Sequence, residues 1–178
     1  MRRLIGVAVL VVVALAFSSR GLAGDKLEPG FSLLFNGKNF DGWKTKKGGE
    51  SLAGKTEAYN GRFKAVDGMI VIDPKVKGDV IIETVKEFGK DVTIKFDFLP
   101  LDKCNNDLFL RGIKFDIILK LKGLKDGWNE LEIVIKGDKA DYKLNGTSIK
   151  TAAAKGTTPF GIRAEFGEIK IKNLRVKE

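Results

Sequence analysis

The fold is decided by the stretch Phe31-Ser-Leu-Leu-Phe-Asn-Gly-Lys-Asn-Phe-Asp-Gly-Trp43. Apolar side chains occupy every second position from Phe31 to Phe35, which is the period of a β-strand. The pairs Asn36-Gly37 and Asp41-Gly42 follow, and both tolerate the positive φ of tight turns. The stretch therefore predicts a strand that ends in compact turns.

The same period of two recurs along the rest of the chain. Apolar side chains alternate with polar or charged ones over residues 92–98 and 130–136, which predicts half-buried strands. Asp67-Gly68 and Asn145-Gly146 separate further alternating runs and predict hairpins. Only Thr151–Lys155 is locally helical in character, and it is too short to stand alone as a helix. About ten short strands without long helices predict an all-β fold, an antiparallel β-sandwich or jelly roll.

The first residues have the pattern of a secretory signal. Arg2 and Arg3 precede an apolar run from Leu4 to Phe17, and Gly21 and Ala23 are small residues before a cleavage point. The run is shorter than the roughly 20 apolar residues that span a bilayer, so we expect no stable membrane insertion after cleavage. We predict a signal peptide over residues 1–23, one domain over residues 24–178, and an exported protein, periplasmic or extracellular.

The residue inventory excludes several kinds of site. The chain has no His, which excludes a Ser-His-Asp triad, a Cys-His pair and a His-ligated metal. We predict no metal site and no cofactor. Cys104 is the single cysteine and is interpreted as a packing thiol. The 32 Lys and Arg residues are interspersed with 23 Asp and Glu residues, whereas a nucleic-acid binder concentrates its basic charge, so we expect no nucleic-acid partner.

Three motifs resemble the 3-keto-disaccharide hydrolase family. The opening stretch is similar to the family's "slfNGkdl.GW" pattern, and Phe160–Val176 is similar to its closing "iGLQaeggpveFrNirv" pattern. Trp128–Ile133 is similar to its "eWNeyeIvvkG" segment. The resemblance implies a jelly roll like those of lectins and glucanases, with one concave face, and a carbohydrate partner such as a keto-sugar or glycan.

The candidate site residues come from strand parity and from this resemblance. Lys95 and Asp97 lie on one face of their predicted strand, opposite Phe96. Arg111 matches the family's "GvfLRg" segment, and Asp116 stands where its "yEvQi" strand has Glu. The predicted catalytic set is Asp97, Arg111, Asp116, Arg163 and Glu165. The predicted substrate-binding residues are Trp43, Trp128 and Lys95. The alternatives are a solvated sheet face for the charged set and structural anchoring for each tryptophan.

The resemblance also implies a reaction. A ketone at carbon 3 of a sugar acidifies the hydrogen on C2, so a carboxylate base can form an enolate, after which the glycosidic oxygen leaves and water adds. Arg111 or Arg163 would stabilise the enolate oxygen, and Asp97, Asp116 or Glu165 would act as the base. The loop Lys120–Gly127 is shorter than the insert of fuller members. The alternative functions are therefore a non-catalytic carbohydrate-binding module and a structural β-sandwich module.

Overall fold

The computed structural model describes residues 27–178 and consists of two antiparallel β-sheets packed face to face. The predicted signal peptide, residues 1–23, lies outside the described residues. The order of the larger sheet is β12 (Thr147–Ala153), β11 (Lys139–Leu144), β10 (Asn129–Lys136), β7 (Val92–Pro100), β14 (Ile169–Lys177), β5 (Met69–Ile72), β4 (Phe63–Val66) and β3 (Glu57–Ala58), with β1 (Ser32–Leu33) paired to β14. The order of the smaller sheet is β2 (Trp43–Thr45), β6 (Val80–Phe88), β13 (Thr158–Phe166), β8 (Asn105–Leu110) and β9 (Ile113–Ile118).

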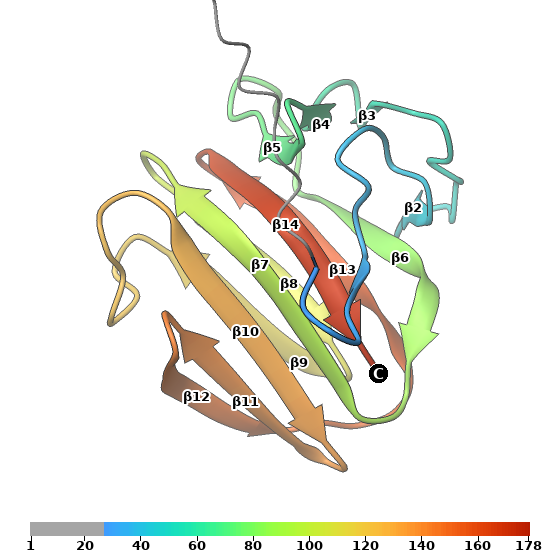
Figure 1. The fold of residues 1–178 in the computed structure, drawn as a ribbon. Helices are drawn as coiled ribbons and strands as arrows, with labels where there is room; N and C mark the ends of the chain where they lie inside the picture. The colour runs from blue at the N-terminus through green and yellow to red at the C-terminus, as the bar shows by residue number, and fades with distance from the viewer. Residues whose placement is uncertain (1–26) are drawn as a thin grey trace, which may run out of the picture.

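The two sheets form the layers of a sandwich, as the sequence predicted. In Figure 1, β7, β10 and β14 of the nine-stranded sheet lie in front of β8, β9 and β13 of the five-stranded sheet. Every strand pairing among residues 27–178 is antiparallel. The fold is therefore an all-β jelly-roll sandwich.

The core fills the space between the sheets with alternate strand residues. Ile94, Phe96 and Phe98 of β7 have no exposed surface, whereas the residues between them are partly exposed. Phe115 of the smaller sheet stacks on Tyr142 of the larger sheet, with ring centroids 4.6 Å apart and planes inclined by 7°. This inward stacking leaves the charged residues of the same strands on the two outer faces.

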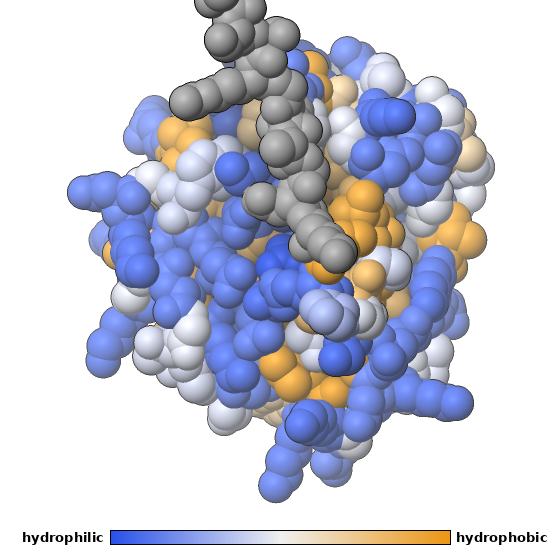
Figure 2. All heavy atoms as spheres, viewed as in Figure 1, coloured by the Kyte–Doolittle hydropathy of each residue, from blue (hydrophilic) through white to orange (hydrophobic). Residues whose placement is uncertain are grey.

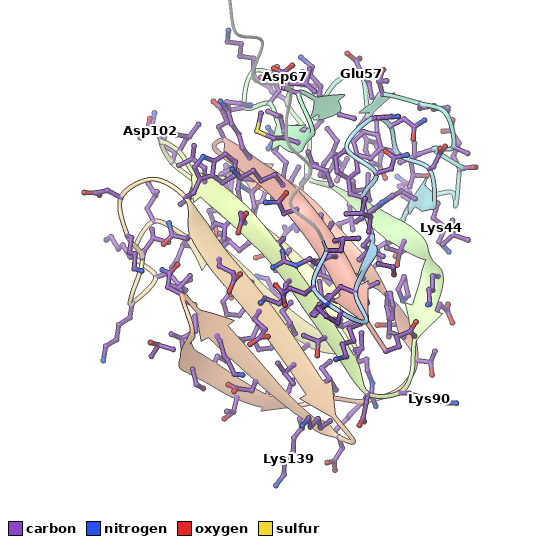
Figure 3. The ribbon with its side chains drawn as sticks, viewed as in Figure 1. Lys44, Glu57, Asp67, Lys90, Asp102 and Lys139 are labelled. Carbon is purple, nitrogen blue, oxygen red and sulfur yellow. The ribbon has the colours of Figure 1, made fainter. Side chains whose placement is uncertain are left out.

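Charged side chains surround the sandwich. Figure 3 shows Lys44, Asp67, Lys90, Asp102 and Lys139 pointing outward at its periphery. Of these, all but the half-buried Lys44 are exposed. No helix among residues 27–178 is long and apolar enough to cross a membrane.

Both predicted hairpin turns are confirmed. Asp67 and Gly68 have φ angles of 50° and 78°, and they join β4 to β5. Asn145 and Gly146 have φ angles of 50° and 81°, and they join β11 to β12. Two consecutive residues with positive φ define the turn whose twist matches that of the flanking strands.

Two segments differ in detail from their sequence patterns. The opening strand is only Ser32–Leu33, because the chain turns away after pairing with Val176 and Arg175, and Leu33 remains 53% exposed. Thr151 to Ala153 is not helical but belongs to β12. Pairing of these residues with Asp141, Ala140 and Lys139 of β11 outweighs the helical preference of the alanines.

Candidate functional site

The outer surface of the five-stranded sheet, here called the five-strand face, carries two rows of side chains in register. The first row runs Lys44, Glu83, Gly161, Phe109 and Lys114 across β2, β6, β13, β8 and β9. The second row runs Ile81, Arg163, Asp107 and Asp116. Cross-strand neighbours on one face have Cβ atoms about 5 Å apart, so the side chains of each row lie within reach of their neighbours except where a glycine intervenes.

A glycine opens a hollow in the first row. Gly161 has no side chain, and the hollow of about 430 Å³ beside it is bordered by Glu83, Phe109 and Lys46. The Lys46 ammonium lies 5.3 Å from the centroid of the Phe109 ring. We call this space the Gly161 hollow. It combines an aromatic surface with a carboxylate and an ammonium group, which suits a ligand with both apolar and polar edges.

A second hollow lies at the other end of β13. It has a volume of about 380 Å³ and is bordered by Asp79, Glu165 and Phe166 among others. The Phe166 side chain is 59% exposed, and a β-bulge after Arg163 shifts the register so that Phe166 pairs with Asn105. We call this space the Glu165 hollow. An exposed aromatic ring beside a carboxylate is the chief feature of this end of the face.

Arg163 connects the charged groups of the face. Its Nη1 donates to Asp107 Oδ2 at 2.7 Å, and its Nε donates to Asp79 Oδ1 at 2.6 Å. Its Nη2 lies 3.2 Å from Glu165 Oε1. Three carboxylates therefore surround one guanidinium, whose planar set of donors suits such multiple pairing.

Asp107 is the buried centre of this network. Its side chain has no exposed surface, and its Oδ2 also lies 3.3 Å from Lys114 Nζ. Its Oδ1 finds no hydrogen-bond partner within residues 27–178. Lys114 in turn lies 2.7 Å from Asp116 Oδ1. The charge of the buried acid is thus offset by two cations that reach it from the surface.

The ion pairs change the proton affinities of the face. The Lys114 ammonium, which hydrogen-bonds to Asp116, lowers the pKa of that carboxyl. Arg163 lowers the pKa of Asp79 in the same way, and the hydrogen bonds that Arg163 donates to Asp79 and Asp107 raise its own pKa. Asp79 and Asp116 are therefore weak bases at neutral pH, whereas Arg163 remains a fixed positive charge.

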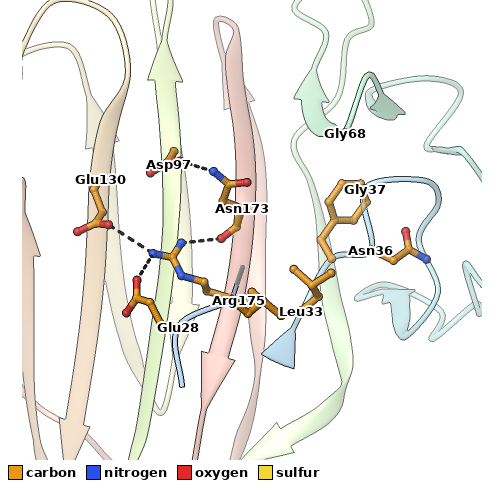
Figure 4. Close-up of a pocket in the computed structure, with 11 residues that line it drawn as sticks. Glu28, Leu33, Asn36, Gly37, Gly68, Asp97, Glu130, Asn173 and Arg175 are labelled. Carbon is orange, nitrogen blue, oxygen red and sulfur yellow. Dashed lines mark hydrogen bonds and ion pairs between the residues drawn. The ribbon is translucent and has the colours of Figure 1, made fainter. Parts of the chain in front are cut away.

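The structure brings together three of the five predicted catalytic residues. Asp116, Arg163 and Glu165 all lie on the five-strand face. Asp97 lies on the opposite outer surface, that of the nine-stranded sheet, which we call the nine-strand face. There its Oδ2 accepts a hydrogen bond of 2.6 Å from Asn173 Nδ2 (Figure 4). The expectation that Asp97 joins the other four does not hold, because β7 belongs to the other sheet.

Lys95 lies on the nine-strand face as well. Its ammonium is 3.1 Å from Glu28 and 3.6 Å from Glu130. Figure 2 shows that this face is mostly hydrophilic and is broken by separate apolar patches. A substrate-binding role for Lys95 would therefore concern this face and not the five-strand face.

Arg111 does not join the predicted constellation either. It is 7% exposed and lies in the turn between β8 and β9. Its Nε donates to Gly156 O at 2.9 Å, and its Nη1 donates to Gly137 O at 2.7 Å and to Lys90 O at 3.4 Å. These contacts hold three loops together at one end of the sandwich. The match to the family motif therefore identifies a structural position.

The two predicted tryptophans have different environments. Trp43 has no exposed surface, packs edge-on against Phe160, and donates its Nε1 hydrogen to Leu34 O at 3.0 Å. A fully buried ring cannot stack on a sugar, so substrate binding by Trp43 does not agree with the structure, and its role is structural anchoring. Trp128 is 37% exposed, with Lys172 Nζ 4.1 Å from the centroid of its ring.

Sequence reasoning missed five residues of the five-strand face. They are Asp79, Glu83, Asp107, Phe109 and Lys114. Asp107 and Phe109 alternate with inward residues of β8, and Lys114 alternates with inward residues of β9, so strand parity was the available signal. Strand parity alone would also select many ordinary solvent-exposed residues as candidates. No sequence motif distinguished these five residues from them.

Cys104 is enclosed in the core of the sandwich. Cys104 is buried, its Sγ is 3.5 Å from Ile117 O, and burial raises the pKa of its thiol to about 11. This environment agrees with a packing thiol. Residues 27–178 contain no group of three or more His, Cys, Asp or Glu side chains arranged to hold a metal ion.

Comparison with known sequences defines the class of protein. The family described as the 3-keto-alpha-glucoside-1,2-lyase-like domain matches residues 30–125. The chain belongs to this family, which confirms the family resemblance of the opening stretch and gives the protein a carbohydrate-related function. The motifs at Trp128–Ile133 and Phe160–Val176 lie outside the matched residues. No curated protein matches the chain.

Solved structures share the fold at low sequence identity. One protein of Parabacteroides distasonis, designated a glycosyl hydrolase, has 18% identity and a TM-score of 0.66, over 83% of this chain and 93% of its own. A second from the same organism has 14% identity and a TM-score of 0.61, over 83% and 98%. A carbohydrate-binding module, CBM66 from Bacillus subtilis, has 14% identity and a TM-score of 0.54, over 77% and 96%.

Proposed function

We propose that the five-strand face binds a glycoside and, when carbon 3 of the sugar is a ketone, cleaves its glycosidic bond. The observation that carries this proposal is the ion pair of Glu165 and Arg163, 3.2 Å apart, in which Glu165 borders the same hollow as the exposed ring of Phe166. The C2 hydrogen and the C3 oxygen sit on neighbouring carbon atoms. A base and a cation that are themselves neighbours suit these two atoms.

Glu165 is the proposed base. Among the three predicted carboxylates, Asp97 lies on the other face, and Lys114 lowers the pKa of Asp116 and thereby weakens it as a base. The Glu165 side chain is 21% exposed and borders the Glu165 hollow described above. Arg163 is held in place by Asp79 and Asp107, so it is already oriented before a substrate arrives.

The proposed reaction proceeds by elimination and hydration. The Glu165 carboxylate takes the proton from C2, and the electron pair of that C–H bond forms the C2=C3 double bond of an enolate whose charge rests on O3, near Arg163. The enolate then re-forms the ketone as the C1–O bond breaks and C1=C2 forms, and the leaving oxygen takes the proton from Glu165. Water then adds its oxygen to C1 and a proton to C2, so the net change is hydrolysis.

A non-catalytic carbohydrate-binding function is the second candidate. Asp79 and Asp107 already hydrogen-bond to Arg163, so a substrate oxygen must compete with carboxylates for its donors. The turn between β9 and β10, residues 119–128, is short, and a face that lacks long loops leaves bound sugars exposed to water. Sugar binding without turnover would follow from such an open face.

The test is an assay of the purified exported protein on 3-keto-trehalose and 3-keto-sucrose beside the unoxidised disaccharides. We expect cleavage of the keto-sugars only, because the parent sugars lack the ketone that holds the enolate charge. Glu165→Gln should lower kcat at least a hundredfold, in the range of general-base removal. Glu132→Gln is the matched control, a strand carboxylate of the other sheet that is ion-paired with Lys143 at 3.1 Å.

The outcomes separate the candidates. Binding of these sugars without turnover would support the carbohydrate-binding function. Turnover that survives Glu165→Gln, Asp116→Asn and Asp97→Asn would keep the activity and reject the proposed base. Neither binding nor turnover across a broad sugar panel would favour a structural β-sandwich module.

The proposed location of the protein is outside the cytoplasm. The support is the sequence pattern of residues 1–23, with two arginines, an apolar run and small residues before position 24. Mass spectrometry of the protein recovered from the cell exterior or periplasm tests this. A mature chain starting near Gly24 is expected, and an intact segment from Met1 to Ala23 would contradict it.

A further inference from the structure

The nine-strand face contains a pocket that the proposed function does not use. Its volume is about 590 Å³, and it lies between the outer side chains of β7, β10 and β14 and the turns that contain Gly37 and Gly68. We call it the Asp97 pocket. Figure 4 shows Asp97, Glu130, Asn173 and Arg175 on one side and Leu33, Gly37 and Gly68 on the other.

One wall of the Asp97 pocket is polar and fixed in position. Asn173 has a φ of 53° and lies in a β-bulge of β14, between Lys172 and Arg175, where its Nδ2 donates to Asp97 Oδ2 at 2.6 Å. Arg175 Nη1 donates to Asn173 O at 2.9 Å. The bulge and Arg175 therefore hold the Asn173 amide beside the Asp97 carboxylate. β-Bulges near binding sites often redirect a side chain in this way.

The opposite wall offers apolar and side-chain-free surface. The turns of Gly37 and Gly68 are in contact, since a Cβ atom on Gly37 would lie 3.5 Å from Gly68 Cα. Leu33 borders the same wall and is 53% exposed. The two glycines add backbone surface without side chains beside the apolar surface of Leu33.

The charges of the pocket select the kind of ligand. Glu28 lies 2.8 Å from Arg175 and 3.1 Å from Lys95, and Arg175 is also 3.4 Å from Glu130. With Asp97 there are three carboxylates against two cations, so an anionic ligand meets a slight excess of negative charge. Two of the three acids are already paired with cations, which weakens attraction for a metal ion. A neutral ligand with hydroxyl groups fits this balance.

We infer that the Asp97 pocket is a second ligand site and binds a neutral sugar through two adjacent hydroxyl groups. Each hydroxyl both donates and accepts a hydrogen bond, so one can donate to Asp97 while its neighbour accepts from the amide of Asn173. The apolar face of the ring then covers Leu33. The site is independent of the proposed activity, because it lies on the other sheet.

The experiment is a titration of the isotope-labelled full protein with methyl β-glucoside, methyl α-mannoside and methyl β-galactoside, followed by amide NMR. At least one of these probes should shift the amides of Gly37, Gly68 and Asn173 in a saturable way. Asp97→Asn and Asn173→Gly should each weaken that binding roughly tenfold, as loss of a hydrogen bond to a charged group or its partner does. Glycine retains the positive φ of position 173, so the bulge is kept while the amide is lost.

Two controls make the test decisive. Glu132→Gln lies on the same face but outside the pocket and should bind as the wild type does. A methyl glucuronide should bind more weakly than the matching neutral glucoside because of the excess of carboxylates. Thermal unfolding of both pocket variants checks that they are folded.

Several outcomes would overturn the inference. These are shifts confined to the five-strand face, unchanged affinity in folded Asp97→Asn and Asn173→Gly proteins, and tighter binding of the glucuronide. If none of the three neutral probes shifts any amide signal up to its solubility limit, the inference is overturned as well.

Discussion

The two outer faces of the sandwich are built from the same residue types with opposite electrostatic organisation. On the five-strand face the buried group is an acid, Asp107, whose side chain has no exposed surface, and the cations approach it from outside. On the nine-strand face the cations Lys95 and Arg175 are only 14% and 11% exposed, whereas their partners Glu28 and Glu130 are 47% and 39% exposed. Charged residues that alternate along a strand therefore do not by themselves show whether the buried charges of a face are negative or positive.

The register of β7 is the first test of this comparison, and it has the largest expected effect. Phe96 lies between Lys95 and Asp97, has no exposed surface, and packs edge-on against Phe98 at 6.1 Å. Phe96→Ala should lower the free energy of unfolding by about 3–5 kcal/mol, measured by urea denaturation. Phe166→Ala, at a 59% exposed position, is the control and should cost well under 1 kcal/mol. Similar losses for the two variants would mean that β7 does not place Lys95 and Asp97 outside.

The second prediction compares the two arginines directly. Arg163→Ala removes a partner of the fully buried Asp107 and should cost about 3 kcal/mol or more. Arg175→Ala leaves Glu28 and Glu130, which are 47% and 39% exposed and retain water, and should cost about 1 kcal/mol or less. Urea denaturation of both variants at pH 7 measures the difference. Equal losses would show that the buried acid does not distinguish the two faces.

Much of the fold was predictable because its signals are local. The Asp-Gly and Asn-Gly turns and the alternation over residues 92–98 each depend on a few adjacent residues. The locally helical character of Thr151–Lys155 does not persist in the fold, because residues 151–153 pair with β11. The site was less predictable, since Asp97 and Arg163 each alternate with apolar residues along their strands in the same way. Only the order of strands, with β7 beside β14 and β13 beside β8, assigns them to different faces.

The third prediction concerns the stability of the protein at acidic pH. The ion pairs of both faces should contribute to it with the same sign. Arg163 lowers the pKa of Asp79, and Arg175 with Lys95 lowers the pKa of Glu28. A carboxyl whose pKa is lowered by folding stabilises the protein above its unfolded pKa, about 4, and loses that contribution as the pH falls through the lower folded pKa. The free energy of unfolding should therefore decline below about pH 4. Asp79→Asn and Glu28→Gln should each make the decline shallower in urea titrations between pH 7 and pH 3. Curves parallel to that of the wild type would contradict the assigned ion pairs.

The smallest expected effect concerns Trp128, whose ring is partly exposed to solvent but is covered on one side by a lysine. The ring is 37% exposed, yet Lys172 Nζ lies 4.1 Å from its centroid, so a sugar that stacked on that side would first have to displace the ammonium. Such a cation–π contact contributes about 0.5–1 kcal/mol at an exposed site. Trp128→Leu should lower the free energy of unfolding by an amount in that range, and Lys172→Met in the same background should add little, because the two changes remove one contact. Sugar binding at either face should be unchanged in Trp128→Leu. A loss of affinity there would show that Trp128 binds sugar and would extend the binding surface of the nine-strand face to the start of β10.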